Sequence, residues 1–373
     1  MTCSADIGLV SIEYTCIDDN HSYTQAISLP TTGVNTTRLN ALEKFVKEIE
    51  RGKREWTIAE IDHRLTEIER MKGNYRPYQV GLAAALACSA FVFLLGGGPV
   101  EMLCSFVGAG CGNFVRRKMI DRHITLLACV AVSVAVACLL YLVPFMALQN
   151  FWGINERHEA GYIGAMLFII PGFPFITSGL DLAKLDMRSG LERAAYALLI
   201  ITVATLVGWL VALMVHLRPA NFAALPLNEW QLLLLRLPAS FCGVFGFSIM
   251  FNSTPKMAAM AGVIGALGNT LRLELVDFGM AAGPAAFLGA LACGLLAAIV
   301  RNRVGYPRIA ITIPSVVIMV PGLYMYRAVY NLGLQSVNTG AEWLTRAMLI
   351  VLFLPLGQVA ARVLTDTKWR HNG

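Results

Sequence analysis

Two Pro-Gly steps, each in the middle of an apolar segment, are the residues best suited to form a binding site. Pro171-Gly172 lies within AGYIGAMLFIIPGFPFITSGL, and Pro321-Gly322 lies within IAITIPSVVIMVPGLYMYRA. Proline removes a helical hydrogen bond and clashes with the preceding turn, while glycine lets the freed backbone diverge. The N–H groups and positive dipole at the start of the second half-helix suit a carboxylate. Each step is therefore predicted to break a helix and to offer its backbone to an anion.

Polar side chains near the two steps extend this candidate binding site. They are Thr177 and Ser178 after the first step, and Tyr324 and Tyr326 after the second. Arg327 lies about 9 Å along a helix from Pro321 at 1.5 Å per residue. An arginine inside the hydrocarbon marks a functional site by default, here as the partner of a carboxylate or a coupling ion. The alternative is that Arg327 snorkels to the outer interface.

Three further polar residues are candidates for ligand binding. Asp181 is the acid nearest the first step, where it either has a gating or proton-coupling role or is a solvated acid at a helix end. Asn113 and Asn269 occupy matching positions at the ends of two apolar segments. A polar residue there can bind a ligand or bridge two helices, and we expect at least one of the pair to bridge helices.

The two Pro-Gly steps belong to an internal repeat with an offset of 150 residues. Gly190-Leu191-Glu192 matches Gly340-Ala341-Glu342 at this offset, and Gly112-Asn113-Phe114-Val115-Arg116 matches Gly268-Asn269-Thr270-Leu271-Arg272 at 156. Interrupted segments at corresponding positions of a repeat point to the binding site of a secondary transporter. Each half holds about five predicted spans. Because five is odd, the second half must insert upside down, so the two breaks can meet near the membrane midplane.

The composition predicts an all-α polytopic membrane protein. Of the 373 residues, 56% are hydrophobic and 14% are charged, whereas about a quarter of the residues in a soluble protein are charged. A spanning helix needs about 20 mainly apolar residues. Ten segments qualify: 78–97, 99–115, 123–146, 161–180, 192–216, 230–252, 256–272, 278–300, 309–328 and 341–363.

Three regions follow from this pattern. Residues 1–76 form a small N-terminal α+β segment, with a β-hairpin over 8–30 that turns at Asp18-Asp19-Asn20, a helix over 37–51 and a second helix opened by a capping box from Thr57 to Glu60. The first transmembrane repeat is predicted over 77–217 and the second over 228–365.

Lysine and arginine are concentrated in alternate loops, which predicts the orientation. If residues 1–76 are cytoplasmic, the inside loops contain clusters such as Arg116-Arg117-Lys118, and the outside loops contain isolated arginines such as Arg272. We therefore expect a multi-pass plasma-membrane protein with both termini in the cytoplasm.

Other function classes find little support. The nine cysteines lie mostly in apolar segments without a CxxC pair, and the six histidines have no zinc-binding spacing. No cluster of titratable groups predicts an enzyme, so no catalytic residue, metal or cofactor is expected. The net charge of +6 comes without a basic patch interleaved with aromatics, which favours contact with anionic lipid over nucleic acid. The sequence leaves open a homo-oligomer.

The motifs resemble the bacterial threonine/serine exporter family over nearly the whole chain. The resemblance lies in GVNTTRLNALEKFVKEIERGK, IIPGFPFITSGLDLAKLDMRSGLERA and IPSVVIMVPGLYMYRAVYNLG. Some relatives split the two halves into separate chains, including a two-component succinate exporter, and this chain resembles the fused form. The matching motif positions are Pro171, Gly172, Pro174, Asp181, Pro321, Gly322, Tyr326 and Arg327.

The resemblance implies export of threonine and serine, driven by the proton motive force. Protons are the implied coupling ion, and the implied substrate is small and carries a carboxylate. Two alternatives remain open: export of small dicarboxylates such as succinate, and an ion channel with the same fold.

Overall fold

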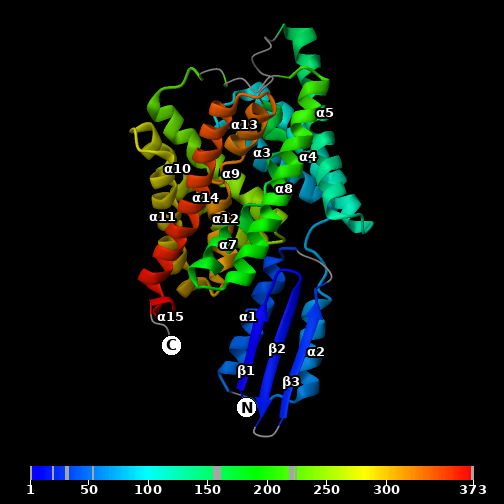
Figure 1. Ribbon diagram of the computed structural model, residues 1–373. Helices are drawn as coiled ribbons and strands as arrows, with labels where there is room; N and C mark the ends of the chain where they lie inside the picture. The colour runs from blue at the N-terminus through cyan, green and yellow to red at the C-terminus, as the bar shows by residue number, and fades with distance from the viewer. Residues whose placement is uncertain are drawn as a thin grey trace.

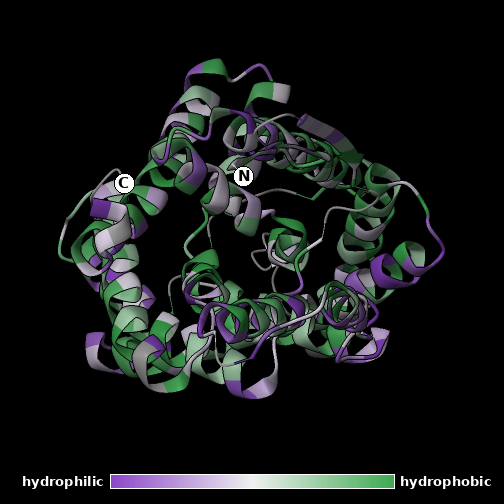
Figure 2. Ribbon diagram, turned by 90° about the horizontal axis from the view of Figure 1, so that it is seen from below, coloured by the Kyte–Doolittle hydropathy of each residue, from purple (hydrophilic) through white to green (hydrophobic). Residues whose placement is uncertain are grey.

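The computed structural model describes residues 2–18, 21–29, 33–52, 54–153, 161–217, 222 and 225–370. The chain forms a helical bundle with a small N-terminal module at one end (Figure 1). The last helix, α15 (Thr367–Arg370), lies at the same end of the bundle as this module. Seen along its length from the module, the bundle is made of largely hydrophobic helices (Figure 2).

The N-terminal module is a three-stranded antiparallel sheet with two helices. The strands are β1 (Thr2–Ile7), β2 (Ser11–Asp18) and β3 (His21–Ser28), in the order β1-β2-β3. The predicted hairpin is β2–β3, in which Asp18 pairs with His21, while Asp19 and Asn20 of its predicted turn lie outside the described residues. Strand β1 was not predicted, because its six residues are all exposed and carry no apolar alternation.

Both helices of the module form where the sequence predicts them, and the second begins at its predicted capping box. Helix α1 (Thr36–Glu50) begins after Asn35, whose side chain accepts a hydrogen bond from the Arg38 backbone N–H. Helix α2 (Ile58–Glu69) begins with the predicted capping box, in which Thr57 and Glu60 satisfy each other's backbone N–H groups. The hydrogen bonds from Thr57 lower the pKa of the Glu60 carboxyl.

The bundle divides into two halves with the same order of elements. The first half contains α3 (Pro77–Leu94), α4 (Pro99–Asp121), α5 (Leu126–Trp152), α6 (Tyr162–Ala165), the 3-10 turn η2 (Leu167–Ile169), α7 (Gly172–Ala183) and α8 (Met187–Met214). The second half contains α9 (Glu229–Met250), α10 (Pro255–Asp277), α11 (Ala282–Val304), α12 (Arg308–Val317), α13 (Gly322–Gly333) and α14 (Val337–Thr365).

Among the described residues, seven helices are long and apolar enough to cross a membrane, or up to nine if each bent pair is one span. The predicted ten therefore remain unconfirmed. Helix α4 is the predicted span that is missing from these nine, because Glu101 and the basic run from Arg116 to Lys118 lower its mean hydropathy. The helix itself forms where the second span was predicted, and it packs between α3 and α5.

The two Pro-Gly steps break their helices with matching backbone geometry. Pro171 has φ −80° and ψ 57°, and Pro321 has φ −82° and ψ 54°. The Gly172 N–H donates to the Ile170 carbonyl at 2.8 Å, and the Gly322 N–H donates to the Val320 carbonyl at 2.9 Å. Each step is thus an inverse γ-turn, and the flanking segments meet at 51° and 48°. The predicted breaks are confirmed.

Matched glycine contacts show that the sequence repeat is also a packing repeat. Gly190 faces Leu182 and Gly340 faces Leu332, both at the 150-residue offset. At the offset of 156, Gly112 packs on Ser133 and Ala137, while Gly268 packs on Gly289 and Cys293. Because glycine has no Cβ, each of these contacts lets two helices approach closely.

Candidate substrate-binding site

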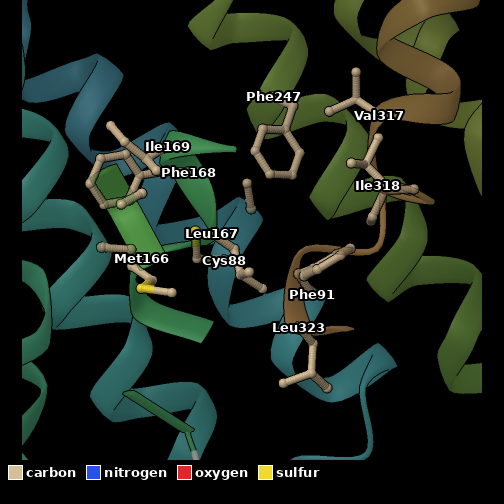
Figure 3. Close-up of a cluster of buried hydrophobic side chains, with 14 of the residues drawn as sticks. Cys88, Phe91, Met166, Leu167, Phe168, Ile169, Phe247, Val317, Ile318 and Leu323 are labelled. Carbon is tan, nitrogen blue, oxygen red and sulfur yellow. The ribbon is translucent and has the colours of Figure 1, made fainter. Parts of the chain in front are cut away.

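The two chain breaks meet in the core of the bundle. Gly172 lies against Val317 and Val320 of the second break, and a Cβ added to Gly172 would be 3.0 Å from Val317 Cγ1. Gly322 lies against Ile170 and Leu167 of the first break. Figure 3 shows this region, with Phe168 and Ile169 on one side of a buried apolar cluster and Val317 and Ile318 on the other. The breaks therefore face each other as predicted, but through apolar side chains that fill the space beside both glycines.

A buried pair of tyrosines also joins the two halves. The hydroxyl groups of Tyr162 in α6 and Tyr326 in α13 form a hydrogen bond, and both side chains are fully buried. Their rings are 5.7 Å apart in an edge-to-face arrangement. Tyr326 was predicted as a site residue from its position after the Pro-Gly step, whereas Tyr162 lies outside the repeat motifs and was missed. The pair fixes the position of α13 relative to the first half.

A cavity of about 480 Å³ lies beside the second break and is here called the distal cavity. Its wall includes Pro321, Gly322, Tyr324 and Arg327, all four of which were predicted as site residues. Other wall residues come from the end of α3, the segment before α9, and helices α9, α10 and α14. Because α9 runs from this cavity toward the module, the distal cavity lies at the end of the bundle away from the module (Figure 1).

Three arginines line the distal cavity, and they differ in their partners. Arg236 forms ion pairs with Glu274 at 2.7 Å and Asp277 at 2.6 Å, so its charge is balanced. Arg272 donates a long hydrogen bond of 3.4 Å to the Met319 carbonyl, and its Nε is buried without a partner. Arg327 also has a buried Nε without a partner. Within the described part of the chain, neither Arg272 nor Arg327 has a carboxylate within ion-pair distance.

The position of Arg327 separates the two alternatives left by the sequence. Only 9% of the residue is exposed, so Arg327 does not snorkel away from the bundle. Its guanidinium lies 4.8 Å from the ring centroid of Trp343, and the ring of Tyr324 lies 5.1 Å from that of Trp343. These two aromatic side chains hold the guanidinium in the cavity wall by a cation–π contact and by packing.

The first turn of α13 adds backbone donors to the same cavity. Helix α13 begins at Gly322, directly after the γ-turn, and Gly322, Leu323 and Tyr324 all line the cavity. The first N–H groups of a helix have no partner within the helix, and the dipole is positive at that end. The γ-turn uses the Gly322 N–H, so the donors available to a carboxylate in the distal cavity are the N–H groups of Leu323 and Tyr324 and the two guanidinium groups.

Two of the predicted residues of the first half, Pro174 and Thr177, line a different cavity. A space of about 800 Å³, here called the proximal cavity, is lined by the N-terminal module on one side and by Phe173, Pro174 and Thr177 on the other. The Thr177 hydroxyl donates to the Phe173 carbonyl at 3.0 Å. Pro171 and Gly172 are buried beside the second break.

The remaining predicted residues make structural contacts outside both cavities. The Ser178 hydroxyl donates to the Gly190 carbonyl at 2.7 Å, which joins α7 to α8. Asp181 accepts a hydrogen bond from Ser189 at 2.9 Å and pairs with Arg193 at 3.3 Å. Asn113 bridges to Val80, and Asn269 bridges to Ser240. Both asparagines therefore tie adjacent helices together.

Sequence reasoning missed Arg272, Trp343 and Arg193 as cavity residues. Arg272 was placed in an outside loop, but α10 continues to Asp277 and carries Arg272 into the distal cavity. The signal was present in the repeat, because Arg272 matches Arg116 at the offset of 156. Trp343 and Arg193 occupy one repeat position, 150 residues apart, but their side chains differ in kind and give no motif.

Comparison with known proteins identifies relatives for both halves. A family described as "Putative threonine/serine exporter" matches residues 1–216, and one described as "Threonine/Serine exporter, ThrE" matches residues 236–364. No solved structure matches the chain.

Curated relatives match part of the chain. An uncharacterized protein of Haemophilus influenzae is 30% identical over 135 residues, which are 33% of this chain and 45% of the relative. A protein of Escherichia coli named "Probable succinate transporter subunit YjjP" is 27% identical over 158 residues, 41% of this chain and 57% of the relative. The chain thus spans about half the length of the curated relatives it matches. Because the first family match alone covers more than half of the chain, this multi-pass membrane protein belongs to the threonine/serine exporter family.

Proposed function

We propose that the chain is a secondary active transporter that exports small metabolites bearing a carboxylate. The observation that carries this proposal is the distal cavity, where Arg272, Arg327 and the start of α13 converge beside a broken helix. Preorganised donors of this kind recognise carboxylate oxygens, and buried guanidinium groups without anionic partners gain most from binding one.

The proposed architecture has ten membrane segments as two inverted five-helix repeats. Three observations support it: the matched glycine contacts, the matched γ-turns, and the positions of the two cavities at opposite ends of the bundle. In this arrangement, the module and α15 are cytoplasmic, and the distal cavity faces the outside of the plasma membrane. The basic residues of the inside loops support the orientation.

Two classes of substrate are candidates for the distal cavity. The family description favours threonine and serine, and proton-driven export is proposed for them. The charge of the cavity favours a dicarboxylate, because Arg272 and Arg327 have no anionic partner in the described ranges, while Glu274 is already paired with Arg236. An amino acid would bring an ammonium group to these cations without a free carboxylate to receive it. Succinate is therefore the second candidate, in keeping with the name of the Escherichia coli relative.

Flux measurements in proteoliposomes test the proposed function. Vesicles containing the purified chain are loaded with labelled threonine, serine or succinate, and efflux is followed with and without an imposed pH gradient. We expect saturable efflux of at least one substrate that rises with the gradient. Absence of protein-dependent efflux for all three would contradict the proposal, and unsaturable conductance in a planar bilayer would favour the channel alternative.

A further inference from the structure

The proximal and distal cavities are built from the same positions of the two halves. Phe173, Pro174, Thr177 and Arg193 line the proximal cavity. At the offset of 150 residues, they correspond to Leu323, Tyr324, Arg327 and Trp343, which line the distal cavity. The proximal cavity therefore lies next to the residues that follow the first break, as the distal cavity lies next to the second break.

Each cavity carries one arginine at these shared positions. In the distal cavity it is Arg327, whereas the proximal cavity has Thr177 there and carries Arg193 at the position of Trp343. The Nε of Arg193 lies 3.3 Å from Asp181 Oδ2, and the side chain remains 28% exposed. A ligand carboxylate can therefore bind the Arg193 guanidinium either together with the Asp181 carboxylate or in its place.

The N-terminal module forms the opposite wall of the proximal cavity. Its residues Leu9, Arg38, Leu42 and Glu69 face the space in front of the first break. Figure 1 shows the module below α7 and α8, the helices that supply the other wall of this cavity. Access to the proximal cavity from this end of the bundle therefore depends on the contacts between the module and the bundle.

One side of the module is anchored by buried hydrogen bonds. The Thr36 backbone N–H donates to the Phe251 carbonyl at 3.1 Å, and the Thr36 and Ser253 hydroxyl groups are 2.7 Å apart. Both residues are fully buried. Asn74 adds a bond from its backbone N–H to the Asn252 side chain at 2.8 Å. This side joins the start of α1 to the turn between α9 and α10.

The other side of the module is held by partly exposed polar contacts at the start of α8. Arg188 pairs with Asp6 at 2.6 Å and donates to the Ser11 hydroxyl at 2.8 Å. The Leu9 backbone N–H donates to the Glu192 carboxylate at 2.5 Å. Solvent-exposed ion pairs stabilise little, because water competes for both partners. These contacts therefore open more readily than the buried anchor at Thr36.

We propose that the proximal cavity is a second substrate site, taking the same small carboxylates at Arg193, and that the N-terminal module is its lid. The lid turns about the anchor at Thr36 and Ser253 and is latched by Arg188 and Glu192. This inference rests on the proposed transport function. It adds where the substrate enters on the module side and which contacts control that entry.

Cysteine accessibility tests the lid. Tyr196 lines the proximal cavity from α8, so the Tyr196→Cys variant is placed in nanodiscs and treated with a membrane-impermeant maleimide. Labelling of that residue is quantified by peptide mass spectrometry, which separates it from the native cysteines. Adding Glu192→Gln should accelerate labelling about tenfold, as expected when one charge-assisted hydrogen bond is lost.

The chain offers a matched control for the latch. Glu342 corresponds to Glu192 in the repeat, and it pairs with Arg346 four residues later without touching the module. Adding Glu342→Gln to Tyr196→Cys should leave the labelling rate unchanged. Equal rates in the Glu192→Gln and Glu342→Gln backgrounds would overturn the lid. Leu39→Cys, on the module wall of the same cavity and only partly exposed, repeats the test if Tyr196→Cys does not fold.

Substrate protection tests the site itself. The substrate that the wild-type protein transports, succinate or threonine, should slow labelling of the introduced cysteine. This should hold both for Tyr196→Cys alone and for Tyr196→Cys combined with Glu192→Gln. Transport by the wild-type protein without such protection would overturn the second site while leaving the transporter proposal intact. Absence of transport by the wild-type protein in proteoliposomes would instead contradict the proposed transport function, on which the second site and the lid both rest.

Discussion

At the residue scale, Arg272 and Arg327 line the distal cavity and have no anionic partner among the residues that the structure describes. Removing a guanidinium group from water costs several kcal/mol unless charges or dipoles compensate. Two carboxylates compensate this cost for Arg236. Arg272 has one long hydrogen bond, to the Met319 carbonyl, and Arg327 has a cation–π contact with Trp343. An anionic substrate bound beside the start of α13 would pair with both guanidinium groups and so compensate this cost.

Replacing Arg272 should weaken transport without removing the fold. The Arg272→Gln change keeps a polar side chain but removes the charge, so we expect KM for the transported carboxylate to rise about 10- to 100-fold, the loss of one charged hydrogen bond. Concentration-dependent efflux from proteoliposomes measures this. Arg346→Gln is the control, because Arg346 also contacts Trp343 but pairs with Glu342 and lies outside the cavity wall. Equal KM values for the two variants would contradict the role of Arg272.

Breaking the tyrosine pair should loosen the contact between the two halves. Tyr162→Phe and Tyr326→Phe each remove one hydroxyl from a buried hydrogen bond and leave the other unsatisfied, so each should cost about 1–3 kcal/mol. The double variant should cost less than the sum, because it leaves no orphaned hydroxyl. Thermal unfolding of the purified proteins in detergent gives the three values. Additive losses would mean that the hydroxyl groups are not paired.

At the element scale, the two chain breaks are equivalent in backbone geometry but not in packing. A Cβ on Gly322 would overlap Ile170 Cδ1, whereas one on Gly172 would meet Val317 Cγ1 at the edge of normal contact. Sequence reasoning predicted both breaks, because proline and glycine act through the local backbone. It did not predict that apolar side chains of one break fill the space beside the glycine of the other, since that contact joins segments about 150 residues apart.

This asymmetry predicts unequal effects of alanine at the two glycines. Gly322→Ala should destabilise the protein by about 1–3 kcal/mol through overpacking and reduce transport, while Gly172→Ala should have a smaller effect on both. Adding Ile170→Ala to Gly322→Ala should restore part of the loss, because it removes the overlapping methyl group. Thermal unfolding and efflux are measured for the wild-type protein and the three variants. A larger effect at Gly172, or no rescue by Ile170→Ala, would contradict the packing described here.

At the scale of the whole molecule, the sequence predicted the helical bundle, the breaks, the β2–β3 hairpin and both module helices. Each follows from local signals, such as apolar length, the Pro-Gly steps and the capping box at Thr57. The two cavities did not follow, because their walls combine the module with α7 and α8, or the end of α3 with α10, α13 and α14. Only folding brings Arg272 beside Arg327.

Equilibrium binding to the purified protein tests the central claim most directly, namely that Arg327 and the start of α13 hold the substrate carboxylate. Isothermal titration calorimetry compares succinate and threonine on the wild-type protein, the Arg327→Gln variant and the Arg346→Gln control. We expect saturable binding of a carboxylate to the wild type and the control, with affinity reduced about 10- to 100-fold by Arg327→Gln. Equal affinity in all three proteins, or no binding of either compound to the wild type, would contradict it.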